Sequence, residues 1–128
     1  MILHSDRIVL ARTLKKYIRL GLAAVKTGEY RRIQTIKGCS ENESEFYDLL
    51  AISDTLRTLG ILGRGEELRA FVSVYMSGRR LTLSTDKNDI SLNALRFAMK
   101  NHCDVRTVYR RIAYFESLYM KIRKSYNV

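Results

Sequence analysis

The sequence contains no proline, and only two cysteines and two histidines among its 128 residues. Because proline is the strongest interruption of a helix, its absence favours long helices over a loop-rich or multidomain chain. Cys39 and Cys103 lie far apart without CxxC spacing, and neither His4 nor His102 completes a ligand set with them. We therefore expect two reduced, apolar thiols, and no metal or other cofactor.

Long apolar runs are also missing from the sequence. No stretch approaches the ~18 uninterrupted apolar residues of a transmembrane helix, so no membrane partner is expected. The opening residues MILHSDRIVLARTLKKY lack the charge order and the cleavage site of a signal peptide. No nucleophile motif, catalytic acid pair or cofactor fingerprint is present. These absences predict a cytoplasmic protein that is not an enzyme, with residues 1–128 forming a single domain.

Positive charge dominates the composition and is unevenly distributed. The chain carries 23 lysines and arginines against 13 acids, a net charge of +10. Residues 1–38 hold nine cations and two acids, residues 39–78 hold three and seven, and residues 79–128 hold eleven and four. Two basic ends around an acidic middle are typical of a protein that offers particular surfaces to a polyanion, which favours a nucleic-acid partner.

Apolar residues recur with the period of a helix through most of the chain, which predicts an all-α domain of about five helices. The first helix is expected to begin at Ser5, its N-cap, and to end near Thr27–Gly28. The segment GEYRRIQTIKGCS follows as a connector, completing the basic region 1–38.

The acidic middle, residues 39–78, is predicted to hold two helices. Ser40 is the expected cap of the first, and the second is expected to stop at Gly78. Residues 79–90 are polar and turn-prone, and predict an exposed loop or a small hairpin. Ser91 is then expected to cap a short helix that precedes the last one.

Residues 91–125 have the spacing of a helix-turn-helix. That motif needs a small residue where its helices cross, a tight turn about four residues later, and an apolar residue about six further on. Ala98, His102 and Val108 occupy those places. Asp104 is expected to cap the last helix, which reaches Ser125, and His102 is expected to adopt a positive φ. An unrelated helical hairpin with a basic surface remains the alternative.

The first turns of the last helix are the predicted DNA-reading surface. With Val108 and Ile112 packed inward, the exposed residues of these turns would enter the major groove. Arginines at such positions bind guanine edges or phosphates, and threonine and tyrosine contact phosphates or thymine methyls. The expected DNA-binding residues are Arg106, Thr107, Tyr109, Arg110 and Arg111, together with Arg79, Arg80, Lys100 and Lys121.

Apolar residues of the last helix also form a heptad seam. Such a seam packs either inside its own chain or against a second copy, and a homodimer would share a palindromic DNA site. The seam consists of Val105, Val108, Ile112, Phe115, Tyr119, Ile122 and Tyr126.

The segments EELRAFVSVYMSGRRL and CDVRTVYRRIAYFESLYMKI carry a resemblance to a known group. They resemble the C-terminal part of phage late-gene transcription regulators, namely the Q-type antiterminators and the ArpU and RinA-like activators, which are similar to region four of sigma factors. The likeness covers residues 64–123 and rests on Tyr75 to Gly78, Thr107 to Arg111, and Glu116. It implies control of transcription through DNA binding, with RNA polymerase or a sigma factor as a second partner.

These patterns favour a sequence-specific DNA-binding transcription regulator, with double-stranded DNA as its partner. Two alternatives stay open at this point. One is a helical adaptor that binds other proteins and not DNA. The other is an RNA-binding module, since the eight tyrosines among basic residues would permit base stacking.

Overall fold

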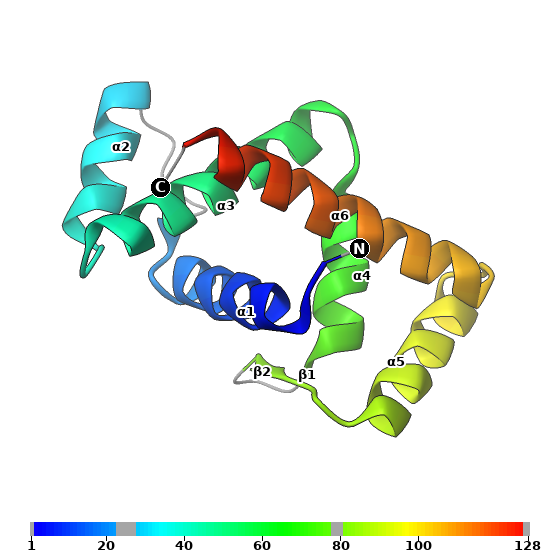
Figure 1. The fold of residues 1–128 in the computed structure, drawn as a ribbon. Helices are drawn as coiled ribbons and strands as arrows, with labels where there is room; N and C mark the ends of the chain where they lie inside the picture. The colour runs from blue at the N-terminus through cyan, green and yellow to red at the C-terminus, as the bar shows by residue number, and fades with distance from the viewer. Residues whose placement is uncertain (1, 23–27, 78–80, 127–128) are drawn as a thin grey trace.

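The computed structural model describes residues 2–22, 28–77 and 81–126. Within these residues it confirms an all-α domain, which has six helices and one minimal hairpin (Figure 1). The elements are α1 (His4–Arg19), α2 (Glu29–Gly38), α3 (Glu43–Ile61), α4 (Gly65–Tyr75), β1 (Met76–Ser77), β2 (Thr82–Leu83), α5 (Lys87–Lys100) and α6 (Val105–Ser125). Over the same ranges, no helix combines the length and the apolar character needed to span a membrane.

The last helix, α6, is the central element of the core. It packs on α3 and α4, while α1 covers α3 and α5 packs against both α4 and α6. The middle of its heptad seam, from Val108 through Ile112 and Phe115 to Tyr119, is at most 2% exposed. Phe115 meets Phe71 of α4 with the ring centroids 5.1 Å apart. The seam is therefore an intrachain core, and this part of α6 is not available to a second copy.

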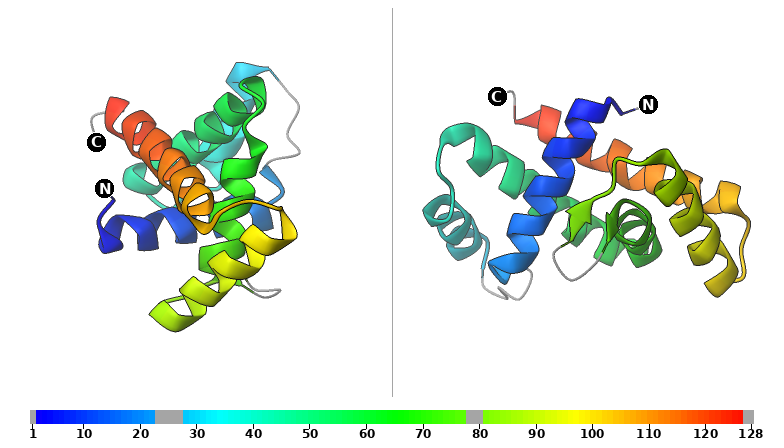
Figure 2. Two further views of the ribbon diagram at one scale, coloured as in Figure 1. Left: turned by 90° about the vertical axis from the view of Figure 1, so that its right-hand side faces the viewer. Right: turned by 90° about the horizontal axis from the view of Figure 1, so that it is seen from below.

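The helices α5 and α2 lie at opposite ends of the molecule (Figures 1 and 2). A tight turn joins α5 to the first residues of α6, so the two helices form a corner that stands away from α1 and α3. The C-terminal turns of α6 run back over α3, where Arg123 Nε donates to Asp48 Oδ1 at 2.7 Å. The core thus fixes one end of α6 and leaves the other at an outer edge.

The N-terminal region differs from the sequence prediction. The first helix begins at His4 with Leu3 as its N-cap, not at Ser5, and it ends at Arg19, well before Thr27–Gly28. The early end follows from Gly21, whose φ of 69° is a left-handed conformation that closes helices. Residues 23–27 lie outside the part of the chain that the structure describes.

The prediction that GEYRRIQTIKGCS is a connector was also wrong, because its residues 29–38 form α2. This helix is short and buries a charged residue in place of a continuous apolar stripe. The guanidinium of Arg32 pairs with Asp54 Oδ1 at 3.0 Å and donates to Ser53 Oγ at 2.7 Å, both on α3. The segment is helical because it docks on α3, which its own periodicity does not reveal.

Two of the predicted helix caps were wrong as well. Asn42, and not Ser40, caps α3 by accepting a hydrogen bond from the Glu45 amide at 2.8 Å. Ser40 instead donates its hydroxyl proton to the Ile36 carbonyl at 2.7 Å and closes α2. At α5 the cap is Asp86 rather than Ser91, so this helix starts about one turn earlier than expected.

The acidic middle is helical, as predicted, but its second helix ends at Tyr75 instead of Gly78. The next residues leave the helix because Met76 and Ser77 pair with Leu83 and Thr82 in an antiparallel hairpin. The predicted hairpin thus exists, but only its strand Thr82–Leu83 lies within residues 79–90, and residues 87–90 belong to α5.

Candidate nucleic-acid interface

The turn between α5 and α6 is a Schellman motif. After the C-cap Asn101, the His102 amide donates to the Met99 carbonyl at 3.3 Å and the Cys103 amide donates to the Ala98 carbonyl at 3.0 Å. His102 has a φ of 54°, as its place in the turn predicted, where glycine is usual. Ala98 is buried where the two helices approach each other. The turn therefore fixes the start of α6 against the end of α5.

Asp104 caps α6 as the sequence predicted. Its carboxylate accepts a hydrogen bond from the Arg106 amide at 2.8 Å, and this bond holds the pKa of the carboxyl below its usual range. Val108 and Ile112 point inward and are buried. The cap and these two core residues thus determine which side chains at the start of α6 point away from the core.

The cap gives a stability prediction. We expect Asp104→Ala to lower the free energy of unfolding, because the first amides of α6 lose their acceptor. Because the folded-state pKa is lowered, this contribution is present above the unfolded pKa of about 4 and is lost as pH falls through the folded pKa. Urea unfolding at pH 7 and pH 3 measures both effects. Asp104→Asn is the control, since asparagine also caps, and an equal loss in both variants would contradict the prediction.

The first two turns of α6 present their polar residues on an outer face. The side chain of Arg106 is 89% exposed, and its ion pair is a local one with Asp104 at 3.5 Å. Arg110 is exposed one turn later, and its Nη2 donates to Thr107 Oγ1 at 3.1 Å. Tyr109 is exposed on a flank of the same segment, and Thr107 is half-buried. Four of the predicted reading residues therefore lie together on one end of α6.

The other predicted DNA-binding residues are distributed differently. Lys100 is exposed in the last turn of α5, and Arg111 is half-buried beside the reading residues. Lys121 is exposed but lies fifteen residues beyond Arg106 on the same helix, which places it roughly 20 Å away. Lys121 is therefore not part of the same surface. Arg79 and Arg80 lie outside the residues that the structure describes.

Among the described residues, three cations of the two basic ends are paired with acids of the middle segment. Lys16 on α1 pairs with Glu45 on α3. Arg32 pairs with Asp54, and Arg123 with Asp48. The fold thus neutralises part of the charge that the sequence assigned to polyanion binding. Fewer lysines and arginines are therefore left unpaired for binding a polyanion than the sequence predicted.

The corner of α5 and α6 keeps its positive charge. Across the ranges that the structure describes, no ion pair involves Arg96, Lys100, Arg110 or Arg111. Arg96, which sequence reasoning did not select, is exposed one turn before Lys100. Its position i−4 from Lys100 was a signal that it shares that face. The later turns of α5 and the first turns of α6 therefore carry positive charge that no described acid pairs with.

Comparisons of the chain with protein families, with curated proteins and with solved structures return no match. Its function must therefore be inferred from the geometry and the charge of its own surfaces.

Proposed function

We propose that this chain is a sequence-specific DNA-binding transcription regulator that reads double-stranded DNA with the N-terminal turns of α6. The observation that carries the proposal is the exposed pair Arg106 and Arg110, one turn apart on the outer face of a helix whose opposite face is core. The major groove of B-DNA, about 12 Å wide, admits such a helix. In this proposal α5 and α6 act as a helix-turn-helix.

The arrangement supports base contacts at the centre and phosphate contacts around it. Arginine side chains bind the O6 and N7 atoms of guanine in a bidentate manner, which is the commonest specific contact. The hydrogen bond between Arg110 and Thr107 holds one guanidinium on the reading face before DNA arrives. Arg96 and Lys100 of α5 and Arg111 of α6 would contact the backbone in this proposal.

The role in transcription rests on the resemblance of residues 64–123 to phage late-gene regulators. RNA polymerase or a sigma factor is the second partner that this likeness implies, and it belongs to the proposal on that ground alone. The pair of outward arginines on a single exposed helix favours duplex DNA, because that helix fits the major groove of B-DNA whereas the major groove of an RNA duplex is too narrow for side chains to read.

Selection of bound sequences from random duplex DNA, using the purified full chain, tests the proposal. We expect a short recovered motif that contains guanines, and a steep fall in affinity with salt as phosphate contacts release counterions. The control ligand is single-stranded RNA of equal length. Failure to enrich any duplex motif would overturn the proposal, and tighter binding to the RNA would favour the RNA-binding alternative.

Homodimer formation is a further part of the proposal, and α5 is the surface that would form it. The α6 seam is used inside the chain, whereas Leu92, Leu95 and Met99 of α5 are 44%, 48% and 70% exposed. They are spaced as one apolar stripe that faces away from the core residues Ala94 and Phe97.

Sedimentation equilibrium tests this contact. We expect the chain to form a dimer at micromolar concentration and Leu95→Asp to shift the equilibrium to monomer, because the aspartates would be desolvated against apolar neighbours. The control is Ile61→Asp, which replaces a more exposed apolar residue, 83% exposed, at the end of α3. A monomeric parent chain, or equal behaviour of the two variants, would contradict a dimer through α5.

A further inference from the structure

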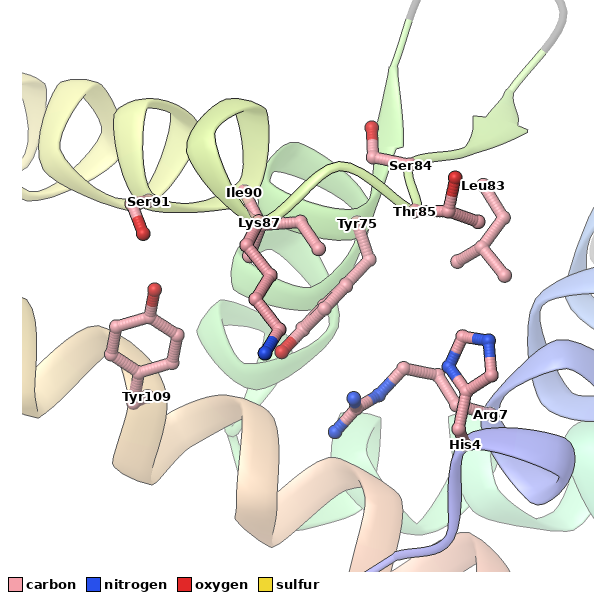
Figure 3. Close-up of a pocket in the computed structure, with 10 residues that line it drawn as sticks. All are labelled: His4, Arg7, Tyr75, Leu83, Ser84, Thr85, Lys87, Ile90, Ser91 and Tyr109. Atoms are coloured by element: carbon pink, nitrogen blue, oxygen red, sulfur yellow. The ribbon is translucent and has the colours of Figure 1, made fainter.

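A cleft of about 520 Å³ lies beside the proposed reading surface (Figure 3). Its walls come from α1, from the end of α4, from the residues around β2, from the first turn of α5, and from Tyr109 of α6. A volume of several hundred cubic ångströms is the size of ordinary small-molecule sites, which are mostly apolar with a few placed polar groups. The cleft is therefore large enough for a ligand of its own.

Two cations project into this cleft. In Figure 3 the guanidinium of Arg7 and the ammonium of Lys87 point into the same space. Arg7 is fixed, because its Nε and Nη2 donate to Glu116 at 2.5 and 3.0 Å and its guanidinium lies 4.4 Å from the centre of the Tyr75 ring. Its Nη1 takes no part in these bonds. Lys87 forms no ion pair with any other residue that the structure describes.

Apolar and hydroxyl groups complete the lining. The Tyr75 ring and the Ile90 side chain form one side, and the hydroxyls of Tyr109 and Ser91 point toward each other across the other (Figure 3). Burial raises the pKa of Tyr75, so its phenol stays neutral and remains a hydrogen-bond donor near neutral pH. Aromatic walls with a cationic end and hydroxyl donors match a planar molecule that carries one anionic group.

We propose that this cleft binds a small organic anion, with an aromatic body between Tyr75 and Tyr109 and a carboxylate or phosphate held by Lys87 and Arg7. This binding does not depend on the DNA-binding proposal. Its consequence does: the occupant contacts Tyr109, between Arg106 and Arg110 on α6, so it would change how these residues meet DNA. In that case the DNA affinity of the chain depends on the concentration of a small organic acid.

Titration of the full chain by ¹H–¹⁵N NMR, without DNA, tests the proposal with phenyl phosphate and benzoate as probes. We expect saturable shifts centred on Lys87, Ile90 and Tyr109, with a Kd of about 1 mM for at least one probe, as befits ligands of this size. Inorganic phosphate supplies only the anionic group and phenol only the aromatic ring, so each should bind at least about tenfold more weakly.

Substitutions locate the site. Lys87→Gln and Tyr109→Ala are each expected to weaken the bound probe about fivefold or more, whereas Lys37→Gln, at an exposed lysine of α2, should change nothing. Both Lys87 and Tyr109 are exposed, and unchanged amide spectra elsewhere confirm that the variants fold. The proposal is overturned if neither probe saturates, if inorganic phosphate binds the same residues as tightly, or if Lys87→Gln leaves the affinity unchanged. All of these outcomes are independent of whether the chain binds DNA.

Discussion

Replacement of both Arg106 and Arg110 by alanine is expected to weaken binding to the selected duplex by about three orders of magnitude, since each bidentate arginine–guanine contact contributes about 2 kcal/mol. The fold should be unaffected, because both side chains lie on the outer face of α6 and bond only to near neighbours on the chain. Fluorescence anisotropy at one fixed salt concentration measures the loss.

The control for this variant removes the same charge elsewhere. Arg57 and Arg69 are exposed arginines that pair with Glu29 and Glu66, outside the α5–α6 corner. Their double alanine variant loses the same two positive charges, and we expect it to weaken binding by less than about tenfold through long-range electrostatics alone. A scrambled duplex separates base reading from phosphate binding, because the Arg106 and Arg110 variant should lose much less affinity there. Equal losses in the two variants would refute a reading role for α6.

Local chemistry explains which parts of the site could be predicted from the sequence. The cap at Asp104, the positive φ of His102 and the inward position of Val108 all depend on neighbours within a few residues. Spacing alone therefore predicted which face of α6 is buried and which is exposed. The prediction of Ser91 as the cap of α5 was wrong because Asp86, five residues earlier, belongs to a residue type that caps helices equally well.

Contacts between distant segments explain what the sequence did not reveal. The helix α2 depends on the burial of Arg32 against Ser53 and Asp54, and a buried arginine appears as a solvent-exposed residue in any periodicity pattern. The cleft beside Tyr109 draws its lining from five elements, so no local motif encodes it. The same holds for the ion pair of Arg7 and Glu116, whose partners are 109 positions apart.

That ion pair is expected to be the most costly polar contact of the fold to break. Glu116 is 4% exposed on the inner side of α6, and the hydrogen bonds from Arg7 to its carboxylate raise the pKa of the guanidinium. We expect Arg7→Met to lower the free energy of unfolding by about 3 to 5 kcal/mol, because a buried carboxylate is left without its cation. Such a loss is a large fraction of the stability of a small domain.

Replacement of the acidic partner should be less destabilising. The Arg7 side chain is already 21% exposed in the parent chain. In Glu116→Leu its guanidinium can therefore reach water along the flexible stem, and we expect the free energy of unfolding to fall by about 2 kcal/mol. Urea unfolding, with the slope compared between variants, measures both.

The double variant Arg7→Met with Glu116→Leu distinguishes pairing from packing. When both charges are removed together, no buried ion remains and apolar contact replaces the pair, so stability should return to within about 1 kcal/mol of the parent chain. Additive losses in the double variant would show that Arg7 acts through packing on the Tyr75 ring rather than through its charge. In the expected case the double-mutant cycle gives a strong favourable coupling energy between Arg7 and Glu116. The ion pair then holds α1 to α6, and either charge left alone in this buried position destabilises the fold.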